Sequence, residues 1–333
     1  MTRLLDVENL TLQFDTDEGR ITAVDDVSFT LDQGKVMGLV GESGSGKSVT
    51  AKSLMRLNAG NAAYGEQTRA TLHLDSGSVD IMGLRNASEL KIVRGGAISM
   101  IFQEPMASFA PAITIGKQMV EQLLIHTDMS PKAARELSIE MLARVGISDA
   151  AKRFGQYAFE LSGGMRQRAM IAMALSTRPR LLIADEPTTA LDVTIQAQVI
   201  DLMKDLVAEF GMAIIFITHD LGVIAQTADH VAVMYLGHIV ERGPVREVIR
   251  TPAHPYTKGL LAALPHLDDL DAPLVPVAGD IPSPLERPGG CVFHTRCPVA
   301  IEGRCDRVVP SFVDLDAEHH VACHLFAMNE VGA

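Results

Sequence analysis

Eight residues near the N-terminus, Gly41-Glu42-Ser43-Gly44-Ser45-Gly46-Lys47-Ser48, have the spacing G-x-x-x-x-G-K-S. An apolar run precedes them at 36–40 and a run with helical spacing follows at 48–57, which together predict a strand, a loop and a helix. The glycines allow open turns that bring backbone N–H groups close to phosphate oxygens, and the helix directs its positive end at the same anion. The stretch therefore predicts nucleotide binding, although the motif alone does not indicate a function.

Within this loop the predicted roles differ by residue type. We expect Lys47 to neutralise the β and γ phosphates and the Ser48 hydroxyl to hold Mg²⁺. The residues predicted to contact the nucleotide are Gly41, Ser43, Gly44, Ser45, Gly46, Lys47 and Ser48.

Composition limits the class of protein. The chain has 333 residues, 47% of them hydrophobic, yet no uninterrupted apolar run approaches the roughly 18 residues that a membrane span requires. The first residues, Met1 to Asp6, have no apolar signal-peptide core, so we expect a cytosolic location. A formal net charge of −12 argues against a nucleic-acid binder and fits a subunit that docks on other proteins.

Further along the chain, apolar runs end in polar residues of catalytic type. The runs 98–102, 181–184 and 213–218 predict buried strands, and they end at Gln103, at Asp185 with Glu186, and at His219. Because ligands collect at the carboxyl ends of strands in open α/β sheets, these strand ends and the phosphate loop should share one cleft. We expect Asp185 to face Mg²⁺ and Glu186 a water molecule, since buried carboxylates need a cation or water.

Helices are predicted in two regions. Residues 115–154 have helical patterning with a Ser130-Pro131 start signal, which indicates a helical insertion. The stretch Leu161 to Arg168 (LSGGMRQR) opens a second helical run, where Ser162 suits an N-cap and Gly163 and Gly164 leave the first N–H groups uncovered. This helix start is a second candidate anion site.

The ordered set GESGSGKS, Gln103, LSGGMRQR, LLIADEP, Ala190-Leu191-Asp192 and His219 resembles the nucleotide-binding subunit of ATP-binding cassette (ABC) transporters over about residues 1–245. LSGGMRQR is the specific element of this resemblance. It implies an α/β P-loop NTPase fold with a RecA-like mixed sheet, an antiparallel β subdomain and a helical subdomain at about 104–175. It also implies that two cassettes pair head to tail, so that ATP lies between the phosphate loop of one and the Ser162-Gly163-Gly164 turn of the other.

The same resemblance assigns roles to single residues. Glu186 is the general base, His219 contacts the γ-phosphate, Gln103 senses Mg²⁺ and the membrane partner, and Asp192 crosses the dimer interface. Each residue type alone also allows a structural role: a lone histidine after a strand is usually structural, and Asp185-Glu186 could begin a helix before Pro187. Phe14 is a candidate for stacking on adenine, with packing in the strand core as the favoured alternative.

Beyond residue 243 the composition changes. Eleven of the 16 prolines lie from Pro244 onward, which favours an extended, turn-rich appendix over a continued sheet. The stretch Thr251 to Leu261 resembles the tail of the oligopeptide and dipeptide importer branch. We therefore expect an ATPase domain at 1–245, a proline-rich linker at 246–290 and a C-terminal module at 291–333.

All four cysteines, Cys291, Cys297, Cys305 and Cys323, lie in that module, separated by five, seven and 17 residues. Structural disulfides are disfavoured in the cytosol, so clustered thiols indicate a metal or redox site, with tetrahedral Zn²⁺ and an iron–sulphur cluster both compatible. Resemblance of the tail to peptide-branch subunits favours a [4Fe–4S] cluster over zinc. One of the nearby histidines could replace a cysteine, although a supporting role is the stronger expectation; these are His294, His319, His320 and His324.

The resemblance implies an ATPase that powers a bacterial importer of di- and oligopeptides from the cytoplasmic face of the inner membrane. Its expected partners are two permease subunits, a second homologous ATPase, with a heterodimer favoured over a homodimer, and indirectly an extracytoplasmic binding protein. The segment 116–126 and the loop at Gln103 are the expected docking surface for the permeases. Alternatives are a soluble ATPase of iron–sulphur assembly or regulation, and an importer of nickel, opines or oligosaccharides.

Overall fold

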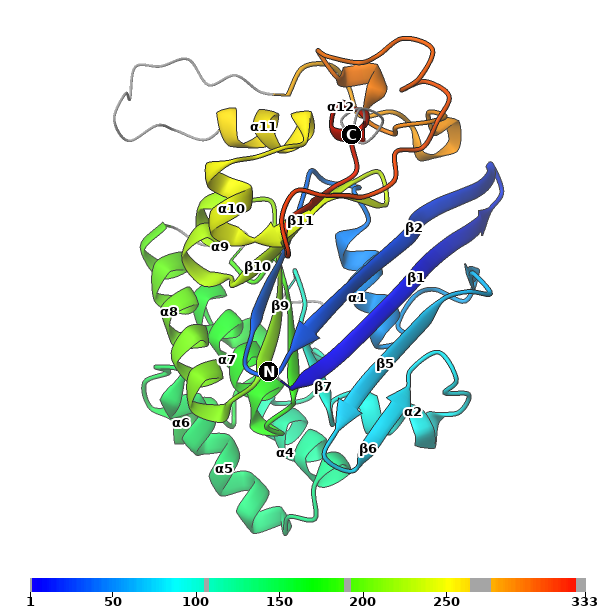
Figure 1. The fold of residues 1–333 in the computed structure, drawn as a ribbon. Helices are drawn as coiled ribbons and strands as arrows, with labels where there is room; N and C mark the ends of the chain where they lie inside the picture. The colour runs from blue at the N-terminus through cyan, green and yellow to red at the C-terminus, as the bar shows by residue number, and fades with distance from the viewer. Residues whose placement is uncertain (1, 105–107, 189–192, 264–276, 328–333) are drawn as a thin grey trace. The chain divides into compact units, whose positions relative to one another are not determined.

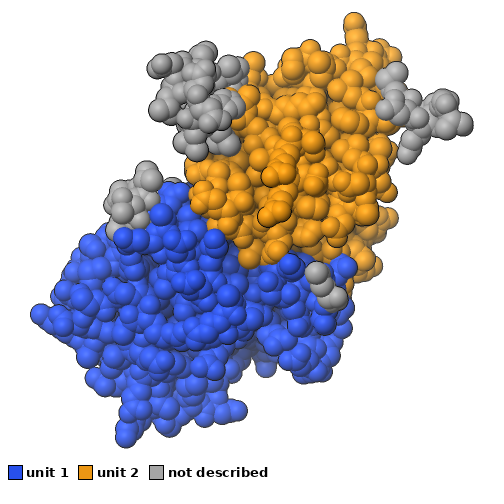
Figure 2. Space-filling view, turned by 60° about the vertical axis from the view of Figure 1, so that its left-hand side comes forward, with its two compact units in different colours: residues 1–4, 31–35, 72–217 blue, residues 5–30, 36–71, 218–333 orange. Residues whose placement is uncertain are grey.

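The computed structural model describes residues 2–104, 108–188, 193–263 and 277–327, with the side chains of 193–195 left aside. The chain forms two compact units, which are coloured separately in Figure 2. Unit 1 contains residues 1–4, 31–35 and 72–217, and unit 2 contains residues 5–30, 36–71 and 218–333. The chain therefore passes between the units several times, and each unit is built from segments that are distant in the sequence.

Unit 1 has a core of parallel strands. β7 (Ile98–Ile101) pairs with β8 (Leu181–Asp185), and β8 pairs with β9 (Ala213–Thr218), with Ile98 opposite Leu181 and Leu181 opposite Ala213. Every residue of these strands is buried, as expected for parallel strands covered on both faces. The three strands predicted from the apolar runs are confirmed.

Helices make up most of the rest of unit 1. They are α2 (Ala87–Val93), α4 (Ile115–His126), α5 (Pro131–Arg144), α6 (Ala150–Arg153), α7 (Gly163–Ser176) and α8 (Val193–Phe210), with a 3₁₀ turn η1 (Ala158–Glu160). Helices α4, α5 and α7 pack against one another (Figure 1). The predicted start of α5 is confirmed, since the Ser130 hydroxyl accepts a hydrogen bond from the Ala133 N–H at 3.3 Å. β5 (Arg69–Leu74), of which residues 72–74 belong to unit 1, is adjacent to β6 (Gly77–Asp80).

Unit 2 contains two groups of strands. β1 (Arg3–Thr16) lies beside β2 (Gly19–Asp32) and pairs antiparallel with β4 (Ala62–Tyr64). β3 (Val36–Val40) runs parallel to β10 (His230–Tyr235), which pairs antiparallel with β11 (His238–Pro244). The helices of this unit are α1 (Lys47–Leu54), α9 (Leu221–Thr227), α10 (Val245–Arg250) and α11 (Pro255–Ala262).

The C-terminal part contains short elements: η2 (Pro284–Glu286), η3 (His294–Arg296), β12 (Val313–Asp314), β13 (His320–Val321) and α12 (His324–Ala327). It is not only a turn-rich appendix, because β13 pairs antiparallel with β11, placing Val321 opposite Glu241. β12 in turn pairs with β13. The tail thus extends the sheet of β10 and β11, a long-range pairing that the proline content concealed.

A buried carboxylate fastens the tail to this sheet. Glu241 of β11 is 0% exposed, and its oxygens accept hydrogen bonds from the backbone N–H groups of Ala253 (2.8 Å) and His254 (2.9 Å). The His319 Nε2 atom lies 2.8 Å from the same carboxylate. A buried carboxylate is tolerated only when its oxygens find such partners, so these contacts fix the start of α11 and the tail against β11.

Within the described ranges, none of the helices combines the length and the apolar character that crossing a bilayer demands.

The buried His254 should make the protein sensitive to acid. Burial lowers the pKa of this imidazole to about 3, so the folded state keeps it neutral while the unfolded chain takes up a proton below about pH 6.5. Stability from this group is therefore complete above that pH and is lost by about 1.4 kcal/mol per pH unit as the pH falls toward 3. His254→Asn, which can still accept the Tyr256 N–H bond made by the native Nδ1, should lose less stability between pH 7.5 and 5.5. Urea unfolding at both pH values measures the difference; identical losses in the two proteins would contradict the prediction.

Candidate nucleotide site and cysteine cluster

The loop between β3 and α1 has the backbone that phosphate binding requires. Gly41, Gly44 and Gly46 have φ angles of +151°, +78° and +99°, a region that other residues rarely adopt. A Cβ atom added to Gly41 would lie 2.2 Å from the Met234 carbonyl oxygen, and one added to Gly46 would lie 2.6 Å from that of Ala23. Glycine is therefore required at both positions by packing as well as by conformation.

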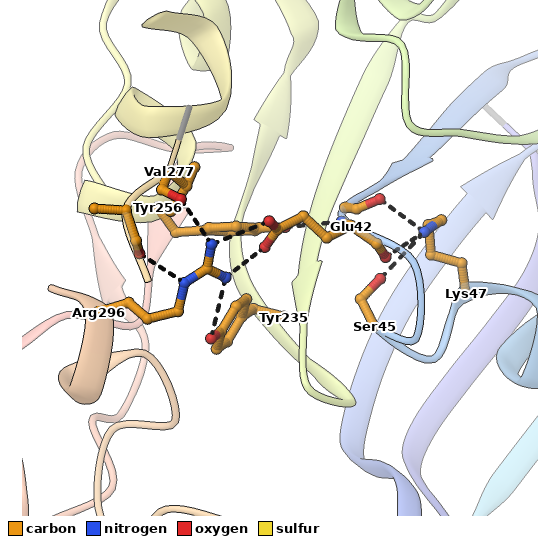
Figure 3. Close-up of polar contacts among 9 residues, drawn as sticks. Glu42, Ser45, Lys47, Tyr235, Tyr256, Val277 and Arg296 are labelled. Atoms are coloured by element: carbon orange, nitrogen blue, oxygen red, sulfur yellow. Dashed lines mark hydrogen bonds and ion pairs between the residues drawn. The ribbon is translucent and has the colours of Figure 1, made fainter. Parts of the chain in front are cut away.

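Lys47 occupies the hollow of this loop. Its side chain is buried at the start of α1, and the ammonium donates to the carbonyl oxygens of Gly41 (2.7 Å) and Glu42 (2.8 Å) and to the Ser45 hydroxyl (3.2 Å) (Figure 3). A cation held among backbone oxygens is already positioned for an anion that enters the loop. Ser48 follows in the first turn of α1 and is half-buried, whereas Ser43 is exposed.

Glu186 and Gln103, which are 83 residues apart, are brought into contact in unit 1. The Gln103 side-chain amide donates to a Glu186 carboxylate oxygen at 2.8 Å. Glu186 has a φ angle of +45°, an unusual conformation for a non-glycine residue that is found preferentially at functional sites. Asp185 before it ends β8 and is buried. The structure thus joins two of the predicted catalytic residues beside a buried carboxylate.

The predicted second anion site is the start of α7. The Ser162 hydroxyl accepts a hydrogen bond from the Met165 N–H at 3.3 Å and caps the helix, as predicted. Gly163 is exposed and Gly164 half-buried, so the first turn of the helix is open on one side. An open helix start of this kind presents N–H groups and the positive end of the helix dipole to a ligand.

Three predicted residues remain to be placed. His219 is exposed after β9, and the residue after it, Asp220, caps α9 by accepting hydrogen bonds from Gly222 and Val223. Phe14 is half-buried on β1 opposite Ala62. Asp192, with Ala190 and Leu191, lies outside the described residues.

The four cysteines gather in one region of unit 2, and all four are free thiols. Burial first, and then the neighbouring charges of Cys305, Cys323 and Cys297, raise the pKa of the Cys291 thiol to about 11. The pKa values of Cys297 and Cys323 are also raised, first by burial and then by neighbouring cysteine charges. Residues spread over the last part of the sequence are thus close enough to repel one another when ionised.

Proximity is not yet a metal-binding arrangement. Among the described residues, no group of three or more His, Cys, Asp and Glu side chains is placed so that it could hold a metal ion. The candidate histidines make other contacts: His294 Nδ1 with the Cys291 carbonyl, His319 with Glu241, His320 with Asp314, and His324 Nε2 with the Val308 carbonyl. They support the surrounding fold.

Sequence reasoning missed the residues that hold the phosphate loop from outside. Glu42 is bonded to Tyr256 and Arg296, which are 214 and 254 positions away in the sequence. No local pattern marks such a contact. The one available signal is that Arg296 is basic, as a partner of the Glu42 carboxylate would have to be.

Comparison with known proteins agrees with this geometry. The family described as ABC transporter matches residues 24–189, and the family described as oligopeptide/dipeptide transporter, C-terminal region, matches residues 240–305. A protein of Brucella abortus (strain 2308), named as a peptide import ATP-binding protein, is 47% identical over 326 residues, covering 96% of each chain. A protein of Brucella suis biovar 1 (strain 1330) with the same description is 48% identical over 298 residues, covering 89% of this chain and 88% of the relative.

Among solved structures, the ATP-binding cassette MJ0796 in a post-hydrolysis dimer bound to ADP and Pi is 25% identical, with a TM-score of 0.64. The match covers 73% of this chain and 99% of that cassette. The fold is that of an ABC cassette, and the chain belongs to the ABC transporter ATP-binding proteins of the oligopeptide/dipeptide branch. It is an ATPase coupled to transport, for which ATP and Mg²⁺ are the expected cofactors.

Proposed function

We propose that this chain powers a bacterial importer of di- and oligopeptides by hydrolysing ATP. The observation that supports this most directly is the match of residues 240–305 to the oligopeptide/dipeptide transporter region, together with 47% identity to a peptide import ATP-binding protein over 96% of the chain. The ATPase domain is residues 1–245, with its helical subdomain at about 104–175, followed by a linker at 246–290 and the cysteine module at 291–333. The comparisons lend no support to a role in iron–sulphur assembly or to other cargoes.

In the proposed mechanism the phosphate loop binds the nucleotide and Lys47 neutralises the β and γ phosphates. Ser48, Asp185 and Gln103 would hold Mg²⁺, which would offset the charge of the phosphates. Glu186 polarises the attacking water and His219 contacts the γ-phosphate. Phosphoryl transfer depends mainly on positioning and charge neutralisation, which these residue types supply. The contact between Gln103 and Glu186 supports this assignment, because it ties the base to the residue proposed to sense Mg²⁺. Phe14 is the proposed adenine contact, and the loop residues are Gly41, Ser43, Gly44, Ser45 and Gly46.

A second cassette completes each site. We place the Ser162-Gly163-Gly164 turn of one cassette against the ATP of the other, with Asp192 at the interface. The open first turn of α7 supports this proposal, since it leaves N–H groups available to an external phosphate. A related but different chain is the favoured partner. Closure on ATP and opening after hydrolysis would convert chemical energy into movement of the permeases.

The permeases are proposed to dock on α4. An apolar groove of about 460 Å³ is lined by Val120, Leu124, Ile125 and Phe154, among others. Leu124 and Ile125 are 41% and 45% exposed, which is unusual for adjacent large aliphatic residues unless a partner covers them. This surface would hold the protein at the cytoplasmic face of the inner membrane as a peripheral subunit, with an extracytoplasmic binding protein delivering the cargo.

The cysteine module is proposed to bind a [4Fe–4S] cluster through Cys291, Cys297, Cys305 and Cys323, with Zn²⁺ as the alternative. The ligand type fits either group, because four free thiols lie in this part of the chain and four thiolates can hold either. A ligating arrangement would require the thiols to approach one another more closely than they do among the described residues. When bound, the metal would staple a small module with few apolar residues, a structural and not a catalytic contribution.

Metal analysis after anaerobic purification tests this part. We expect about four iron and four sulphide per chain, with broad absorbance near about 400 nm, because four thiolates match the ligand set of such a cluster. Cys297→Ser should lose the metal and destabilise the module. Stoichiometric zinc without iron would show that the module is a zinc site and not a cluster site. A metal-free protein would refute both assignments.

Replacement of the proposed base tests the ATPase assignment. Glu186→Gln should keep ATP binding and reduce hydrolysis by about 10²- to 10⁴-fold, since an amide cannot accept a proton from water. Glu140→Gln makes the same chemical change at an exposed position of α5 and serves as the control. Turnover is measured on the assembled importer, and uptake of a labelled tripeptide is measured in cells. Undiminished turnover in Glu186→Gln would remove Glu186 from this role, whereas ATP-driven uptake of a different cargo would overturn peptide import alone.

Charges placed on α4 test the docking surface. The double variant Leu124→Glu, Ile125→Glu should weaken binding to the permeases by more than about tenfold, because two apolar contacts become desolvated charges. ATP binding by the free chain should persist. Val309→Glu introduces a charge at a residue that is 63% exposed in the C-terminal part and controls for added charge. Co-purification of the double variant with the permeases at the wild-type level would place the interface elsewhere.

A further inference from the structure

Glu42, the second residue of the phosphate loop, is held by two residues from the C-terminal part of the chain (Figure 3). Its backbone N–H donates to the Tyr256 hydroxyl at 2.8 Å. Its carboxylate receives two hydrogen bonds from the Arg296 guanidinium, at 2.7 Å and 3.1 Å. Both contacts lie within unit 2. The loop is therefore anchored at the backbone and at the side chain of one residue.

Arg296 is itself fixed in place. Its remaining N–H groups donate to the carbonyl oxygens of Ala278 and Val277, both at 3.0 Å, and one lies 3.4 Å from the Tyr235 hydroxyl. The side chain is 3% exposed, and its hydrogen bond with Glu42 raises the pKa of the guanidinium. Because hydrogen bonds hold the planar guanidinium from several sides, it has one available orientation, and the ion pair with Glu42 is pre-organised. Arg296 ends η3 and precedes Cys297, so the anchor belongs to the cysteine module.

Tyr256 is equally constrained. It is 0% exposed, and its ring contacts those of Tyr235 and Phe293, with centroid distances of 4.8 Å and 5.3 Å. Burial raises the pKa of its hydroxyl, which therefore remains neutral and accepts the Glu42 N–H bond. α11 begins at Pro255 and is capped by His254, so the hydroxyl is placed by the same buried segment that Glu241 holds.

These anchors act where the nucleotide phosphates would bind. The Glu42 N–H that Tyr256 holds shares its peptide group with the Gly41 carbonyl, which accepts a hydrogen bond from Lys47 Nζ at 2.7 Å, so movement of this peptide would displace the ammonium. The Glu42 carboxylate is a negative charge in a loop that must attract a polyanion, and it is 27% exposed. Unpaired, it would repel the phosphates; paired with Arg296, its charge is neutralised.

We propose that Arg296 and Tyr256 are positioning residues of the C-terminal module, which set the affinity of the phosphate loop for ATP through Glu42. This inference rests on the proposed nucleotide site. Arg296 neutralises the carboxylate and Tyr256 fixes the peptide that carries the Lys47 contact. The module thereby acts on ATP binding without touching the nucleotide.

The test uses the full-length chain, a fluorescent ATP analogue with Mg²⁺, and variants at the ion pair. Arg296→Met should raise the Kd by about tenfold, because the carboxylate is left unpaired beside the phosphates. The defect should shrink as ionic strength rises, since salt screens the repulsion. Adding Glu42→Gln to Arg296→Met should recover most of the lost affinity, which a merely structural role of Arg296 would not predict.

Arg287→Met is the matched control. Arg287 belongs to the same part of the chain and has a side chain that is 18% exposed, but it pairs with Asp25 at 3.2 Å and donates to the Leu236 carbonyl at 2.7 Å, both outside the phosphate loop. This variant loses the same charge and should leave the Kd within about twofold, because its partner carboxylate is not part of the loop. Tyr256→Phe removes only a hydroxyl, preserves the packing, and should raise the Kd by about threefold.

The outcomes separate the two proposals. Failure of the wild-type chain to bind the analogue would refute the nucleotide site itself. Binding by Arg296→Met and Tyr256→Phe with the wild-type Kd, or failure of Glu42→Gln to improve the affinity of Arg296→Met, would overturn the positioning role while the nucleotide site stands. If Arg296→Met fails to fold, Tyr256→Phe decides alone: a weakened Kd supports the role and an unchanged Kd overturns it.

Discussion

The buried carboxylate of Glu241 is the interaction on which the arrangement around the phosphate loop depends. With 0% exposure it needs its three partners, the N–H groups of Ala253 and His254 and the His319 ring, and it holds them against β11. Those contacts fix the start of α11, and hence place the Tyr256 hydroxyl within hydrogen-bonding distance of the loop. A charge that must be satisfied in an apolar interior thus orders segments from two distant parts of the sequence.

Contacts from several segments hold the resulting loop in place. Gly41 and Gly46 fit against backbone atoms of neighbouring strands, and Lys47 is held by the carbonyl oxygens of the loop itself. Catalysis of phosphoryl transfer relies on groups that need no rearrangement when charge develops. A functional residue is also held in position in unit 1, where the backbone of Glu186 has an unusual conformation and Gln103 donates a hydrogen bond to its side chain.

Much of the fold and of the candidate site could be predicted because the signals are local. The strands β7, β8 and β9 follow from continuous apolar runs, and the starts of α5 and α7 follow from Ser130 and Ser162. The pairing of β13 with β11 could not be predicted, since two-residue strands carry too little pattern to identify a partner. The cysteines were correctly singled out, but their spacing did not specify how the thiols are arranged.

The sequence by itself determined the class of protein, the phosphate loop and the candidate catalytic residues, because each depends on a few neighbouring residues and their backbone angles. Only the tertiary structure decided which distant groups meet: Gln103 with Glu186, Glu241 with His319, and Glu42 with Arg296. Such pairs are chosen by the packing of whole segments, since any of several charged residues could satisfy a carboxylate. Burial and geometry select one of them, and neither can be inferred from the residues that neighbour it in the sequence.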